Sequence, residues 1–121
     1  MSTTVLIIED EPMIALEIQE TLKKNGFHCP EVATAVEEIF DKFRRVQPDV
    51  ILMDINLRSY TDGVDAAHRL SLFGSTPVIF LTANEDPFIE KRAKAIQNSH
   101  YVRKPFDESE LVDLINRVAR R

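Results

Sequence analysis

Cysteine is almost missing from this sequence of 121 residues, in which Cys29 stands alone. A lone cysteine cannot form a disulfide within the chain, and the N-terminus lacks the basic start and long apolar run of a secretory signal peptide. Nowhere does an apolar run approach the roughly 20 residues that cross a bilayer. These absences predict a cytoplasmic protein that does not enter the membrane.

Basic residues are in the minority, with 15 Lys and Arg against 20 Asp and Glu and a formal net charge of −5. Such a charge gives no general attraction to nucleic acids or to anionic membranes. We therefore expect no direct nucleic-acid or membrane partner. The length is that of one domain, residues 1–121, which is enough to bury a core.

Short apolar runs alternate with helical patterns along the whole chain. The runs VLII, VILM and VIFL are continuously apolar, which predicts strands that are covered on both faces, as in a parallel sheet between helix layers. The fold class is therefore α/β: a doubly wound sheet of five parallel strands with five helices and the common order 2-1-3-4-5. The expected strands are 5–8, 28–32, 50–53, 78–81 and 101–102, and the expected helices start near 13, 34, 62, 86 and 107.

Helix starts and one edge strand can be predicted from local chemistry. Thr34 with Glu37, and Asp107 with Glu110, have the spacing of an N-cap and a capping box. Pro30 interrupts the second strand, and a proline within a strand indicates an edge position.

Carboxylates follow two of the expected strands. Glu9, Asp10 and Glu11 come directly after the first strand, and Asp54 comes directly after the third. In the order 2-1-3-4-5 these strands are neighbours, and ligands bind beyond the carboxyl ends of such strands. A group of carboxylates favours a hard cation such as Mg²⁺. The alternative for the first three acids is a solvated helix start, where negative charge complements the helix dipole.

Polar residues also follow the last two expected strands. Thr82 comes after VIFL, and Lys104 follows Tyr101-Val102. Taken singly, Thr82 could be a helix cap and Lys104 a surface lysine. Together with the carboxylates they supply metal ligands, a nucleophile, a hydroxyl donor and a fixed cation, which are the groups that phosphoryl transfer needs.

Five segments give the chain a family resemblance: VLIIEDEP, ILMDINL, the Asp62-Gly63 turn, VIFLTA and YVRKPF. In this order and spacing the chain resembles a response-regulator receiver domain, the CheY-like fold of two-component signalling. The resemblance covers the whole chain. It implies a phosphorylation switch rather than a classical enzyme, one that assists only its own phosphotransfer and dephosphorylation.

The resemblance also implies roles for single residues. Asp54 would be the phosphoacceptor, and Thr82 and Lys104 would hold phosphoryl oxygens. The cofactor would be Mg²⁺, with ligands from the carboxylates of Glu9, Asp10 and Asp54 and from the main-chain carbonyl of Asn56.

Two further expectations concern the fifth strand. Tyr101 would be an aromatic switch whose ring moves inward when Thr82 is drawn to the phosphoryl group, although an ordinary aromatic at the edge of the core is the alternative. The bond between Lys104 and Pro105 would be cis. The family often has Gly-Ala before the aromatic residue, and here Asn98 could fill the left-handed helix end instead.

The implied partners are a histidine kinase or histidine phosphotransfer protein and a downstream effector. The effector would read the surface of the fourth helix, fifth strand and fifth helix, which could also support a phosphorylation-dependent homodimer. A receiver-shaped interaction module that needs no phosphorylation is a competing function.

Two further protein classes share part of the pattern. A haloacid-dehalogenase-like phosphatase also uses Asp, Thr, Lys and Mg²⁺, but it has a second acid two residues after the nucleophile, where this chain has Asn56. A flavodoxin-like FMN carrier shares the fold, but we would expect its strand-end loops to offer Ser, Thr or Gly to phosphate.

Overall fold

The five strands form one parallel sheet in the order β2-β1-β3-β4-β5, which confirms the predicted fold class. The structure is a computed structural model, and it describes residues 2–55, 63–83 and 87–119. The strands are β1 (Val5–Ile8), β2 (Val32–Ala33), β3 (Val50–Asp54), β4 (Val78–Thr82) and β5 (Ser99–Arg103). The helices are α1 (Pro12–Lys24), α2 (Val36–Val46), α3 (Gly63–Ser71), α4 (Pro87–Lys94) and α5 (Glu108–Val118).

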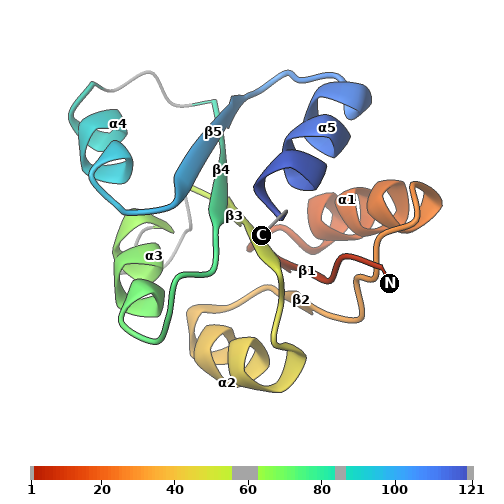
Figure 1. The fold of residues 1–121 in the computed structure, drawn as a ribbon, viewed down its shortest axis with the longest axis horizontal. Helices are drawn as coiled ribbons and strands as arrows, with labels where there is room; N and C mark the ends of the chain where they lie inside the picture. The colour runs from red at the N-terminus through yellow and green to blue at the C-terminus, as the bar shows by residue number, and fades with distance from the viewer. Residues whose placement is uncertain (1, 56–62, 84–86, 120–121) are drawn as a thin grey trace.

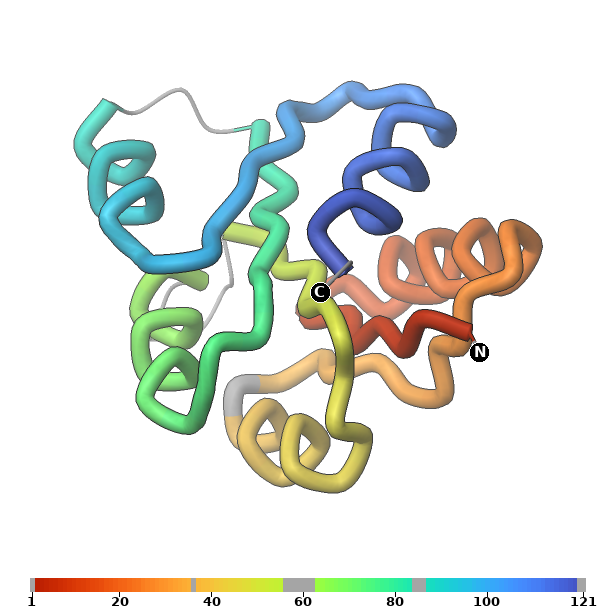
Figure 2. Tube along the Cα trace, in the orientation of Figure 1, coloured from red at the N-terminus to blue at the C-terminus, as the bar shows by residue number. Residues whose placement is uncertain are grey.

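The helices cover the sheet in two layers. Figure 1 shows α1 and α5 on one face and α2, α3 and α4 on the other. Figure 2 traces the chain through each strand and then through a helix before it reaches the next strand. This alternation brings the carboxyl ends of all five strands to one edge of the sheet.

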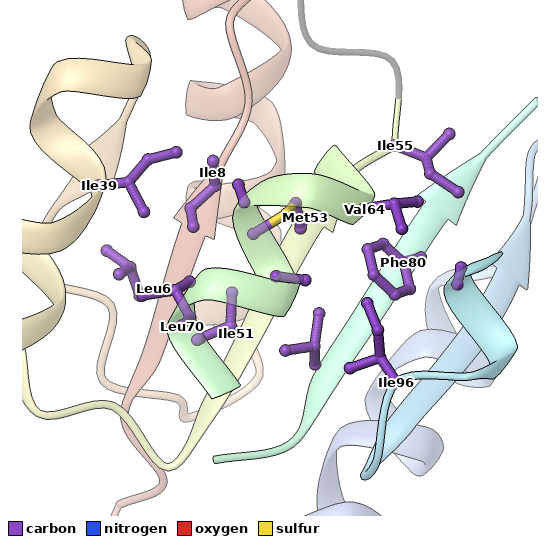
Figure 3. Close-up of a cluster of buried hydrophobic side chains, with 14 of the residues drawn as sticks. Leu6, Ile8, Ile39, Ile51, Met53, Ile55, Val64, Leu70, Phe80 and Ile96 are labelled. Atoms are coloured by element: carbon purple, nitrogen blue, oxygen red, sulfur yellow. The ribbon is translucent and has the colours of Figure 1, made fainter. Parts of the chain in front are cut away.

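Each face of the sheet has its own apolar core. Side chains from β1, β3 and β4 alternate between the two, because successive residues of a strand point to opposite faces. Figure 3 shows the cluster beneath α2, α3 and α4, which includes Ile8, Met53, Phe80 and Leu70. The cluster beneath α1 and α5 includes Ile7, Leu52, Ile79, Leu22 and Ile115.

The second strand differs from the prediction. It contains only Val32–Ala33 and lies at the sheet edge beside β1, with one separate bridge between Thr4 and His28. Pro30 precedes this strand rather than interrupting it. The expected edge position is confirmed, but the expected extent of 28–32 is wrong, because proline cannot donate a hydrogen bond to the ladder.

The start of α2 also differs by one residue. Its N-cap is Ala35, and the Glu38 carboxylate accepts hydrogen bonds from the backbone N–H groups of Thr34 (2.8 Å) and Ala35 (3.2 Å). The predicted pair Thr34 and Glu37 is therefore wrong, because the neighbouring acid makes the contact. In α5, Asp107 is the N-cap as expected, but its side chain makes no capping hydrogen bond.

The turn before β5 contains the one left-handed residue that the sequence indicated. Asn98 has φ 62°, a conformation that asparagine tolerates better than most residues. Its side-chain amide donates a hydrogen bond to the carbonyl of Ser75 at 2.9 Å. Asn98 thus ends the α4 region and leads the chain into β5 at the sheet edge.

Candidate functional site

Three carboxylates meet at the carboxyl end of the sheet, as the sequence predicts. Glu9 and Asp10 follow β1, and Asp54 is the last residue of β3. Each offers one oxygen, and the three oxygens lie within 4.8 Å of one another. The neighbouring strands β1 and β3 bring them together, because Ile8 is in register with Met53.

Glu9 is the most deeply buried of these acids, with 2% of its surface exposed. Its Oε2 accepts a hydrogen bond from the Glu11 N–H at 3.1 Å. Burial raises the pKa of Glu9 to about 7, and the nearby charge of Asp54 acts in the same direction. Two carboxylates about 5 Å apart repel by about 3 kcal/mol at an effective dielectric near 20, so this cluster is suited to a cation.

Lys104 supplies positive charge at the same place. Its Nζ lies 4.0 Å from Oε1 of Glu9, although Lys104 and Glu9 are far apart in the sequence. The peptide bond between Lys104 and Pro105 is cis, the isomer that the family resemblance implies. The described geometry therefore joins Lys104 to the acidic cluster.

Thr82 ends β4, which lies between β3 and β5 in the sheet. It is buried, with 2% of its surface exposed, and its carbonyl accepts a hydrogen bond from the backbone N–H of Lys104 at 2.8 Å. Its register partner on β5 is Arg103. Thr82 is therefore at the same edge of the sheet as the three carboxylates and Lys104.

Tyr101 lies on β5, half-buried between the sheet and α4. Its ring packs against Phe80 with 5.8 Å between centroids, and its hydroxyl donates a hydrogen bond to the carbonyl of Glu90 at 2.8 Å. Burial raises the pKa of this hydroxyl. The expected role of Asn56 falls outside the described residues.

Gly63 has a role at the site that sequence reasoning missed. Its N–H donates a hydrogen bond to the carbonyl of Ile55 at 3.1 Å. A Cβ at this position would overlap the carbonyl oxygen of Asp54 and would lie 2.9 Å from the Cα of Ile55. The glycine therefore allows α3 to begin directly against the end of β3, and the only signal in the sequence was its place after Asp62.

A set of oxygens like this one fits Mg²⁺, which prefers carboxylate and carbonyl ligands and keeps several waters. The three carboxylates carry more negative charge than Lys104 alone can offset. The same edge also holds a hydroxyl and an ammonium group, which can bind the oxygens of a phosphoryl group. The arrangement is chemically suited to place a phosphoryl group on Asp54.

Comparisons with known proteins agree with this geometry. The response regulator receiver domain family matches residues 5–116. The transcriptional regulatory protein PdtaR of Mycobacterium tuberculosis is 31% identical over 111 residues, which cover 92% of this chain and 54% of that protein. The transcriptional activator protein IrlR of Burkholderia pseudomallei is 33% identical over 117 residues, which cover 97% of this chain and 50% of that protein. The chain spans about half the length of these curated relatives.

Solved structures show the same similarity. The receiver domain of the Francisella response regulator 1452 matches with a TM-score of 0.84 and 28% identity, covering 98% of this chain and 97% of that one. Chemotaxis protein CheY4 of Vibrio cholerae matches with a TM-score of 0.84 and 26% identity, covering 98% of this chain and 99% of that one. The receiver domain of the sensor histidine kinase PA1611 from Pseudomonas aeruginosa matches with a TM-score of 0.83 and 27% identity, covering 98% of both chains. That receiver domain holds a magnesium ion in its active site cleft.

Proposed function

The chain belongs to the response regulator receiver domains, and from this premise we propose that it is a phosphorylation switch with Asp54 as its phosphoacceptor. The observation that carries the proposal is the group of Glu9, Asp10 and Asp54 beside Lys104 at the edge of the sheet. Members of this family act as signalling switches, and these residues are the groups that phosphoryl transfer needs.

The phosphoryl donor is a phosphohistidine on a histidine kinase or on a histidine phosphotransfer protein. A carboxylate oxygen of Asp54 attacks the phosphorus atom, and the bond from phosphorus to the donor nitrogen breaks as the new bond to oxygen forms. The donor nitrogen takes up a proton from solvent, and Asp54 carries an acyl phosphate. Lys104 and Thr82 then bind the phosphoryl oxygens. Hydrolysis of the acyl phosphate returns Asp54 to the carboxylate.

Glu9, Asp10 and Asp54 would hold Mg²⁺, together with the main-chain carbonyl of Asn56. When bound, the ion offsets the charge of the carboxylates and orients the phosphoryl oxygens. The PA1611 receiver domain, which holds magnesium in its cleft, supports this part of the proposal.

Phosphorylation acts by favouring one of two arrangements of the region from β4 to β5. Thr82 is drawn toward the phosphoryl group, and Tyr101 occupies the inward position. The surface of α4, β5 and α5 then binds an effector or a second copy of the chain. The cytoplasm, where its kinase partner would act, is the proposed location. Among the helices that the structure describes, none is long and apolar enough to cross a membrane.

A direct test is to incubate the protein with Mg²⁺ and acetyl phosphate and to measure its intact mass. The wild type is expected to gain one phosphoryl group that is lost on mild base treatment, whereas Asp54→Asn gains none because its amide is not a nucleophile. Asp113→Asn makes the same change on the exposed face of α5 and should behave like the wild type.

The outcome of this test also distinguishes the competing functions. An unmodified wild type would favour an interaction module that works without phosphorylation, and equal labelling of Asp54→Asn would show that another residue is the phosphoacceptor. Sustained turnover of a phosphate ester would favour a phosphatase.

A further inference from the structure

The side of β5 that faces α4 is lined with polar contacts at alternate residues. Ser99 Oγ donates a hydrogen bond to the carbonyl of Ala93 at 2.9 Å, and the Tyr101 hydroxyl donates to the carbonyl of Glu90 at 2.8 Å. Arg103 Nη2 donates to Oε2 of Glu90 at 3.0 Å. Two of the three contacts therefore end on Glu90.

The carboxylate of Glu90 is shared between two cations. Its Oε2 binds Arg103, and its Oε1 lies 2.9 Å from Nζ of Lys94, one turn further along α4. The same Nζ lies 5.9 Å from the centre of the Tyr101 ring. Glu90 thus pairs through its carboxylate with the cation that lies over the ring, while its backbone carbonyl accepts the hydrogen bond from the ring hydroxyl.

This cluster is connected to the acidic pocket through consecutive residues of the chain. Arg103 is in register with Thr82, and the next residue, Lys104, donates its N–H to the Thr82 carbonyl at 2.8 Å. Lys104 Nζ lies 4.0 Å from Glu9. A movement of Thr82 toward the pocket therefore acts on the strand segment that Glu90 binds.

We propose that Glu90 is a positioning residue that holds α4 on β5 in the arrangement where Tyr101 packs against Phe80. The inference rests on the function proposed above, because it takes this inward arrangement to be the one that a filled acidic pocket selects. Partly exposed ion pairs are weak and reversible, which suits them to adjusting a two-state equilibrium more than to building the core.

The test is a titration with beryllofluoride in the presence of Mg²⁺, followed by amide NMR spectra. Glu90→Gln removes the charge but keeps the backbone carbonyl that accepts the Tyr101 hydroxyl. The beryllofluoride concentration that half-saturates this variant is expected to be about threefold higher than for the wild type, which is the size of effect expected for one partly exposed ion pair. Glu20→Gln, which removes an exposed acid on α1, should bind like the wild type.

A double-mutant cycle tests whether Glu90 acts through Arg103. Arg103→Gln alone should raise the half-saturating concentration to a similar degree, and the double variant should raise it no further than the larger single change. Urea unfolding of the same variants should show midpoints close to that of the wild type, because the core is untouched.

Two results would overturn the inference in different ways. If Glu90→Gln binds as tightly as the wild type, Glu90 does not position the switch and the proposed function still stands. If the two changes simply add, the contact between Glu90 and Arg103 is not the one that positions it. If the wild type itself does not bind beryllofluoride, the proposed function fails and the inference falls with it.

Discussion

Helices α4 and α5 lie on opposite faces of the same strand, β5, and they are attached to it by different chemistry. The side toward α5 is apolar: Val102 packs in one cluster with Leu111, Leu114 and Ile115, and Ile115 has 0% of its surface exposed. The side toward α4 is mostly polar, and within α4 itself only Ala93 is buried.

This difference indicates which helix can move. Burial of a large aliphatic side chain contributes about 1.5–3 kcal/mol, whereas an exposed ion pair contributes about 0–1 kcal/mol. Displacement of α5 would therefore expose several core side chains, whereas displacement of α4 exposes little beyond Ala93 and Ile89 and otherwise exchanges weak polar contacts for contacts with water. The strand between them, β5, carries both Tyr101 and Arg103 on the movable side.

The comparison predicts its largest effect for Ile115→Ala. Removal of this fully buried side chain leaves a cavity beneath α5 and should lower the free energy of unfolding by about 3 kcal/mol. Urea unfolding followed by circular dichroism measures the loss.

The matched change in α4 is Ile89→Ala, since Ile89 is half-buried against the other cluster. It should lower the free energy of unfolding by about 1 kcal/mol, because less apolar surface is lost from the core. Equal losses for the two variants would show that α4 is packed as firmly as α5.

A smaller effect is expected for Tyr101→Phe. The change removes the hydroxyl bond to Glu90 but keeps the ring against Phe80, so it should lower stability by about 1 kcal/mol. Hydrogen exchange should become faster for the amides of α4 and stay unchanged for those of α5. Faster exchange in both helices would mean that the bond supports the whole domain and not the α4 side alone.

The prediction of the fold succeeded where strands are buried on both faces. The continuous runs at 5–8, 50–53 and 78–81 place β1, β3 and β4 to within one residue, because burial between two helix layers leaves no polar position in the pattern. The edge strand β2 has only two residues, too few for any periodicity, so its bounds were wrong. At the start of α2, adjacent acids offered two equivalent capping partners, and only the three-dimensional path of the chain selects Glu38.

The residues of the site could likewise be predicted only in part from the sequence. Glu9, Asp10 and Asp54 could be predicted as neighbours because parallel strands bring their carboxyl ends to one edge. Glu90 and Arg103 meet only through the packing of α4 on β5, and no local spacing indicates that pair. The spacing of Glu90 and Lys94, four residues apart on a helix, would have indicated half of the cluster.

The smallest expected effect is a difference in acid sensitivity between the two sides of β5. On the α5 side, burial and the charge of Arg117 lower the pKa of His100 from its usual 6.5. On the α4 side, the hydrogen bond from Lys94 and the charge of Arg103 lower the pKa of Glu90 from its usual 4.5.

Both shifts make the fold less stable in acid than at neutral pH, but they act in different pH ranges. The unfolded chain binds a proton at His100 more readily than the folded chain does, so the stability due to neutral His100 is lost as pH falls below about 6.5. The stability due to ionised Glu90 persists until pH falls below about 4.5. Urea midpoints measured from pH 7.5 to 5.5 should therefore fall less for His100→Gln than for the wild type, while Glu90→Gln should keep the wild-type slope. The opposite result, in which Glu90→Gln changes the dependence of the midpoint on pH and His100→Gln does not, would show that the α4 side of β5 is the acid-sensitive one.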